Sequence, residues 1–103
     1  MGKLQHFFEV NNDKRIFVCY KNSSIRDLSQ IHKFCLKYGK ILTILMPKVS
    51  KYPNDVLSIL ESDNTSRIYE VSVMAMKSVL KKRGEQYTQQ IKDSVLIPDE
   101  FLV

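Results

Sequence analysis

The chain has 103 residues, 44% of them apolar, and 16 basic against 11 acidic residues give it a net charge of +5. This length provides for one hydrophobic core and excludes a second domain of ordinary size. The longest apolar run, Ile41–Pro47, is far shorter than the roughly 20 residues of a membrane-spanning helix, and the N-terminus lacks the apolar region of a secretion signal.

The N-terminal segment, residues 1–13, is predicted to be either an extension or one strand of a hairpin. Its apolar residues include Phe7 and Phe8, and an Asn-rich turn follows. The next run, Arg15–Tyr20, is rich in β-branched and aromatic side chains, which is typical of a strand.

A helix is predicted from Ser24, which has the chemistry of an N-cap, to Tyr38. Gly39 is expected to end it, because glycine adopts positive φ without steric cost. The apolar run Lys40–Met46 then predicts a buried strand that Pro47 closes.

The segment that follows is open to two readings. Val56–Leu60 fits a short strand, or part of a short helix that begins at Pro53, and we favour the strand. From Ser66 a helical period predicts a second long helix that ends at Gly84, although Val71 and Met74 intrude on its polar side. A last strand is expected at Val95–Ile97.

The resulting order is strand, helix, strand, strand, helix, strand. It predicts an α/β (α+β) fold, the ferredoxin-like split βαβ sandwich, in which an antiparallel sheet carries two helices on one face. The domain itself is assigned to residues 14–98, with residues 99–103 as a C-terminal tail.

Parts of this pattern resemble an atypical RNA recognition motif. Ile16–Val18 is similar to the start of the family's first-strand hexamer, Phe34–Ile41 to its junction between helix and second strand, and Ile91–Ile97 to the approach to its fourth strand. The resemblance implies an RNA-binding or ribonucleoprotein-assembly module in the nucleus or cytoplasm. Its partners would be single-stranded RNA, a protein subunit of an RNA-processing complex, or both.

The same resemblance implies a binding surface on the sheet face opposite the helices. The predicted contacts combine side chains of that face with basic residues beside it: Phe17, Cys19, Leu45, Lys14, Arg15, Lys48 and Lys51. The expected third strand lacks the aromatic residues on which bases stack. An alignment that moves this strand to Arg67–Met74 recovers Tyr69, but it breaks the predicted helix and is set aside. Phe7, Phe8 or Phe101–Val103 are candidates to cover the face.

The alternative function is a protein-protein interaction module with no RNA binding of its own, either of the same fold or resembling a BRCT domain. The glycine-ended helix, the long second helix and Val95–Phe101 carry the second resemblance. It implies a parallel sheet and a phosphopeptide or another domain as partner, and a helix over 53–62 would favour it.

No cofactor, metal, small-molecule substrate or enzymatic activity is predicted. His32 and Cys35 lie one helical turn apart, but a zinc site needs further ligands, and a thiol on the apolar side of a helix is expected to be protonated and inaccessible. Cys19 and Cys35 both stand in apolar segments, which indicates reduced thiols and an intracellular protein.

Overall fold

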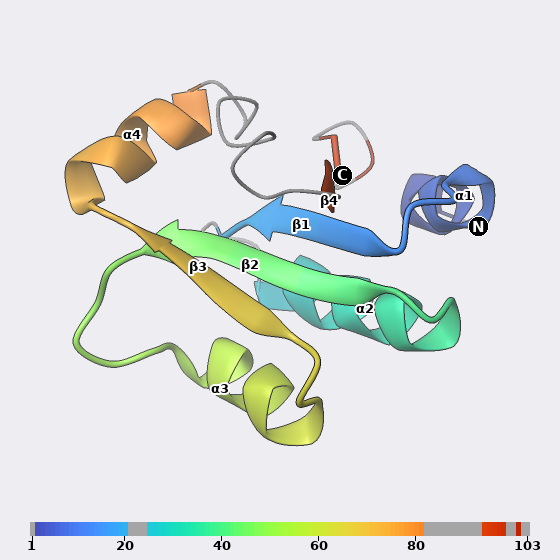
Figure 1. The fold of residues 1–103 in the computed structure, drawn as a ribbon, viewed down its shortest axis with the longest axis horizontal. Coiled ribbons are helices and arrows are strands. Elements are labelled where there is room, and N and C mark those ends of the chain that lie inside the picture. The colour runs from blue at the N-terminus through green and yellow to red at the C-terminus, as the bar shows by residue number, and fades with distance from the viewer. Residues whose placement is uncertain (1, 21–24, 82–93, 99–100, 102–103) are drawn as a thin grey trace.

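The computed structural model describes residues 2–20, 25–81, 94–98 and 101, and its fold is drawn in Figure 1. Eight elements follow one another along the chain: α1 (Lys3–Val10), β1 (Arg15–Cys19), α2 (Ile25–Lys37), β2 (Ile41–Pro47), α3 (Asn54–Ser62), β3 (Arg67–Val71), α4 (Val73–Lys81) and β4 (Ser94–Leu96). The chain combines helices with one sheet, and β1, α2, β2 and β4 lie within two residues of their expected positions.

The sheet has the strand order β3-β2-β1-β4, and all of its strand pairs are parallel. The prediction of an antiparallel, ferredoxin-like sheet is therefore wrong. Parallel neighbours need a crossover connection, and in this chain helices lie between the successive strands. The order also reverses direction after β3, because β4 returns to the far side of β1.

Helices cover both faces of the sheet (Figure 1). Right-handed crossovers place α2 and α3 together on one face while the chain moves from β1 to β3. The return to β4 runs in the opposite direction, so α4 lies on the other face. The domain is thus a doubly wound sheet rather than a sheet with one open face.

Two segments account for the wrong topology. The preferred strand at Val56–Leu60 lies inside α3, where Val56 and Ile59 are buried one turn apart against the core. The start of the predicted second long helix is the strand β3. The alignment that was set aside, with the third strand at Arg67–Met74, therefore put this strand in the right place. Val71 ends this strand and is buried beneath α4. The sequence prediction put this apolar residue on the polar side of a helix, and that misfit indicated that the segment is not one continuous helix.

The core consists of two clusters, one on each face of the sheet. Alternate residues of β1 divide between them: Ile16 and Val18 face α2 and α3, whereas Phe17 and Cys19 face α4. This alternation confirms the predicted sides of β1. The N-terminal segment is a helix rather than a hairpin strand, and it adds Phe7 and Phe8 to the first cluster.

The end of α2 follows the prediction. Gly39 has a φ of 65°, and the amide of Lys40 donates to the carbonyl oxygen of Cys35 at 2.8 Å. This bond satisfies one of the last free carbonyl groups of the helix. The second predicted glycine stop, Gly84, lies outside the described residues.

Among the described residues, the structure contains no helix that is both long and apolar enough to span a bilayer.

The burial of Phe17 predicts that its replacement affects folding. Phe17→Ala should lower the free energy of unfolding by about 3–5 kcal/mol, because the phenyl ring is fully buried and its loss leaves a cavity. Urea denaturation measures this change. Leu36→Ala is the control, since Leu36 is 58% exposed and its truncation should cost less than about 0.5 kcal/mol. Equal effects of the two changes on stability would contradict the finding that helices cover both faces of the sheet.

Candidate functional site

The residues predicted to form an open sheet surface lie in the core. Phe17, Cys19 and Leu45 do share one face, as expected, but Met76 of α4 packs in the same cluster and all of them are buried. The expectation that this face is open is wrong, because it depended on having both helices on the opposite side. The predicted covering residues Phe7 and Phe8 lie on the other face.

The predicted basic residues are divided between opposite ends of the sheet. Lys14 and Arg15 stand at the amino end of β1, where Arg15 pairs with Ile41 at the start of β2. Lys48 and Lys51 follow the carboxyl end of β2, about 20 Å away at the rise of a parallel strand. The structure therefore does not bring these four side chains into one basic surface.

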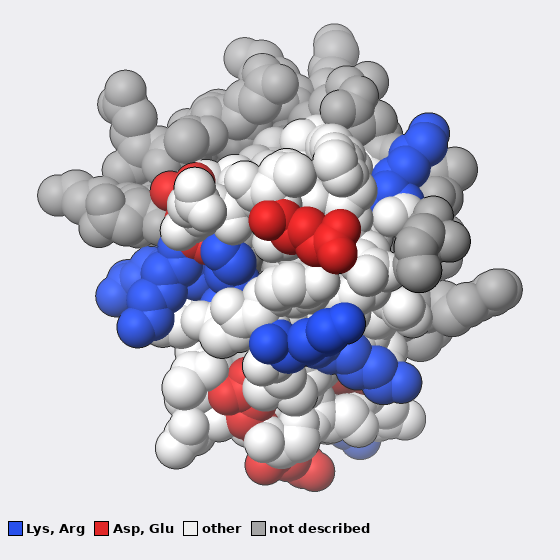
Figure 2. All heavy atoms as spheres, turned by 90° about the vertical axis from the view of Figure 1, so that its right-hand side faces the viewer, with Lys and Arg blue, Asp and Glu red and all other residues white. Residues whose placement is uncertain are grey.

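The amino-end side of the molecule carries charges of both signs. Figure 2 shows this side, and acidic side chains lie between its lysine and arginine side chains. Lys40 is engaged within the fold, since its ammonium group donates to the carbonyl oxygens of Asn11 at 2.7 Å and Asp13 at 2.6 Å. No broad single-sign field is visible among the residues described there.

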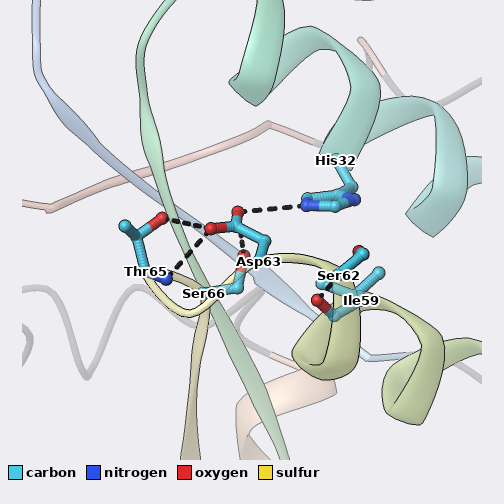
Figure 3. Close-up of polar contacts among 6 residues, drawn as sticks. All are labelled: His32, Ile59, Ser62, Asp63, Thr65 and Ser66. Carbon is cyan, nitrogen blue, oxygen red and sulfur yellow. Dashed lines mark hydrogen bonds and ion pairs between the residues drawn. The ribbon is translucent and has the colours of Figure 1, made fainter.

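A buried polar cluster centred on Asp63 joins α2 to the turn before β3 (Figure 3). The Asp63 carboxylate accepts hydrogen bonds from the backbone amide of Thr65 at 2.9 Å and from the hydroxyl groups of Thr65 and Ser66. His32 Nε2 lies 3.1 Å from the same carboxylate. The cluster thus ties a residue of α2 to a turn 31 residues later in the chain.

These bonds also determine the ionisation of Asp63. The side-chain hydrogen bond from Thr65 is the largest cause that holds the pKa of Asp63 well below its ordinary value, and the bonds from Ser66 and His32 act in the same direction. Burial opposes the shift. An ionised carboxylate is an acceptor only, so His32 donates its Nε2 proton to it.

The geometry of the cluster differs from that of a catalytic triad. In a serine, histidine and aspartate triad, the hydroxyl group bonds to the imidazole nitrogen that does not face the carboxylate. Here Ser66 donates directly to Asp63 at 2.9 Å, and the hydroxyl group of Ser62 donates to the carbonyl oxygen of Ile59 at 3.2 Å. The hydroxyl groups around Asp63 are therefore used to hold the turn.

A groove of about 400 Å³ lies between α2 and α3. It is lined by Ser29, His32, Lys33, Asp55, Ser58, Ile59 and Ser62. One oxygen of Asp55 accepts from the amide of Val56 at 2.9 Å and from the phenol of Tyr20 at 3.4 Å. The other oxygen is buried and has no hydrogen-bond partner among the described residues. The unpartnered oxygen is closed off from solvent, so it is not available to a ligand in the groove.

The two cysteines belong to different faces of the sheet. Cys19 lies in the cluster beneath α4 and Cys35 in the cluster beneath α2. Burial is the largest cause that raises the pKa of Cys35 to about 12, and the charge of Asp63 adds to it. The expectation of a protonated, inaccessible thiol is confirmed. Within the described part of the chain, no group of side chains has the composition of a metal site.

Three exposed apolar side chains lie just beyond the carboxyl ends of β2 and β3. Val49, Val73 and Met74 are 40%, 58% and 81% exposed, and we call them the edge patch. The loop after β2 meets the end of β3 here, because the amide of Lys48 donates to the carbonyl oxygen of Val71 at 2.7 Å. Sequence reasoning did not identify the patch. The one available signal was Met74, an apolar residue on the polar side of the predicted second helix.

The chain has no match among family models, curated proteins or solved structures. The two resemblances therefore rest on the residues quoted for them. The parallel sheet and the helix Asn54–Ser62 are features that the BRCT resemblance implied, whereas the RNA recognition motif implied an antiparallel sheet.

The polar cluster generates a prediction about acid stability. Asp63→Asn should lower the free energy of unfolding by about 1–3 kcal/mol near neutral pH, because a buried charged acceptor is lost. Since folding depresses the pKa of Asp63, its contribution is present above the ordinary value of 3.8 and is lost as pH falls toward the lower folded value.

The test is denaturation of the native chain and of Asp63→Asn between about pH 7 and about pH 2. The difference in stability between the two proteins should shrink as the pH falls below the ordinary value of 3.8. Asp13→Asn is the control, because Asp13 is exposed. A difference that is constant over this range would show that the charge of Asp63 does not stabilise the cluster.

The environment of Cys35 predicts slow thiol chemistry in the folded protein. In a Cys19→Ser variant, alkylation of Cys35 near neutral pH should be far slower in the native state than in denaturant, because the thiol is buried and protonated. Mass spectrometry of timed samples measures the two rates. Similar rates would contradict the described burial of Cys35.

Proposed function

We propose that this chain is a non-catalytic module that binds a protein partner through the edge patch. The exposure of Val49, Val73 and Met74 at one edge of the sheet is the observation that carries this proposal. Exposed apolar side chains that lie singly are ordinary, whereas neighbouring ones mark interaction sites. Methionine in particular adapts its shape to different partners.

The arrangement of the edge supports a docking role. Val73 and Met74 are the first two residues of α4, and Val49 follows the residue that bonds to the end of β3. The buried Val71 anchors the strand end beneath them, so the patch stands on a packed part of the fold. A surface held in this way loses little conformational freedom when a partner binds.

The remaining chemistry of the described residues supports binding over catalysis. Asp63 is engaged by the turn and by His32, and Cys35 is buried with a raised pKa. Cys19 and Cys35 are buried on different faces of the sheet, which supports an intracellular location, in the nucleus or the cytoplasm, where thiols stay reduced.

RNA binding is the less favoured proposal. Base stacking needs exposed aromatic rings, and Phe17 is in the core. An RNA contact would instead depend on Lys48, Lys51 and the net charge of +5, and would weaken steeply with salt. We therefore keep RNA as an outcome of the test below.

Affinity capture from the cells that express the chain tests the proposal. The native chain is compared with Val73→Ser/Met74→Ser, and with Leu36→Ser as a matched control, because Leu36 and Val73 are each 58% exposed. We expect a protein that the native chain and the control retain, that the double variant loses, and that ribonuclease treatment leaves in place. Capture that ribonuclease abolishes would favour RNA, and capture unchanged in the double variant would exclude the edge patch.

A further inference from the structure

We propose that the segment bound by the edge patch is acidic as well as apolar. This inference rests on the proposed function and specifies the chemistry of the partner. The partner would insert large apolar side chains between Val49, Val73 and Met74 and present aspartate or glutamate side chains to the lysines around them.

Three lysines lie next to the edge patch. Lys48 directly precedes Val49 and Lys51 follows it by two residues, while Lys77 lies one helical turn after Val73. All three side chains are exposed. Within the described part of the chain, none of the three makes an ion pair or a side-chain hydrogen bond.

The acidic residue closest to the patch along the chain is already engaged. Glu70 lies one residue before Val71, and its carboxylate accepts a hydrogen bond from the phenol of Tyr52 at 2.9 Å. Among the described residues near the edge patch, three lysines stand against this one carboxylate. Complementary charge steers a partner toward such a surface and sets its orientation, while apolar burial supplies most of the affinity.

This combination favours an acidic protein segment over RNA. The lysines alone would attract either polyanion, but the exposed side chains of the edge patch, Val49, Val73 and Met74, are apolar. Aliphatic side chains do not provide the flat platform on which bases stack. They do fit leucine, isoleucine or phenylalanine side chains of a peptide, whose burial removes apolar area from water.

Fluorescence anisotropy with labelled probes tests the inference on the full chain. The first probe is a short peptide in which leucine and glutamate occupy opposite sides of a helix. In the second probe serine replaces each leucine, in the third glutamine replaces each glutamate, and the fourth is a single-stranded RNA oligonucleotide. We expect binding of the first probe only, and a decrease of that binding with salt.

Variants assign the contact to the patch and to its lysines. Met74→Ser should weaken binding of the first peptide about tenfold or more, through loss of buried apolar area. Lys48→Gln/Lys51→Gln/Lys77→Gln should weaken it about tenfold and flatten its salt dependence. Lys33→Gln and Leu36→Ser are the controls away from the edge, and circular dichroism establishes that each variant is folded.

The outcomes separate this inference from the proposed function. Equal binding of the glutamate and glutamine peptides, or no effect of the lysine changes, would overturn the inference that the partner is acidic. Binding of a protein at the edge patch would remain the proposed function. Binding of RNA in preference to the first peptide would also overturn it. If Met74→Ser leaves every probe and every captured protein bound as before, the proposed function fails as well.

Discussion

The crossover connection is the constraint on which the rest of this structure depends. Parallel neighbouring strands cannot be joined by a tight turn, so the chain must cross back over the length of the sheet between them. Here helices α2 and α3 form two of these crossover connections. The reversal from β3 to β4 sends α4 to the other face. Helices consequently cover both faces, and binding surfaces are left to the ends of the sheet and the helices.

Local features of the chain were predictable because they depend on neighbouring residues. The alternation of β1 and the positive φ of Gly39 follow from side-chain and backbone sterics alone. The segment Val56–Leu60 was not predictable in this way, since a five-residue apolar run satisfies both a buried strand and one side of a helix. Its assignment decided the topology, because a strand there permits an antiparallel sheet and a helix there supplies a crossover.

The candidate site was less accessible to sequence reasoning than the fold. The partners His32 and Asp63 are 31 residues apart, and only the turn chemistry of Asp63 with Thr65 and Ser66 is visible in the sequence. The lysines were identified, but the end of the sheet at which each one lies was not considered. Because β1 and β2 run parallel, the start of β1 and the end of β2 lie at opposite ends of the sheet, which separates Arg15 from Lys48.

The packing of Phe7 against Phe101, with ring centroids 5.3 Å apart, has a consequence for how the domain combines with other sequences. Residues near both ends of the described fold meet at one place, although almost the whole domain lies between them in the chain. A unit with adjoining ends can be inserted into a surface loop of a host protein, or circularly permuted through a short linker, without stretching its core. The same contact makes the ends mutually dependent, so a fusion that pulls residue 101 away would also uncover α1.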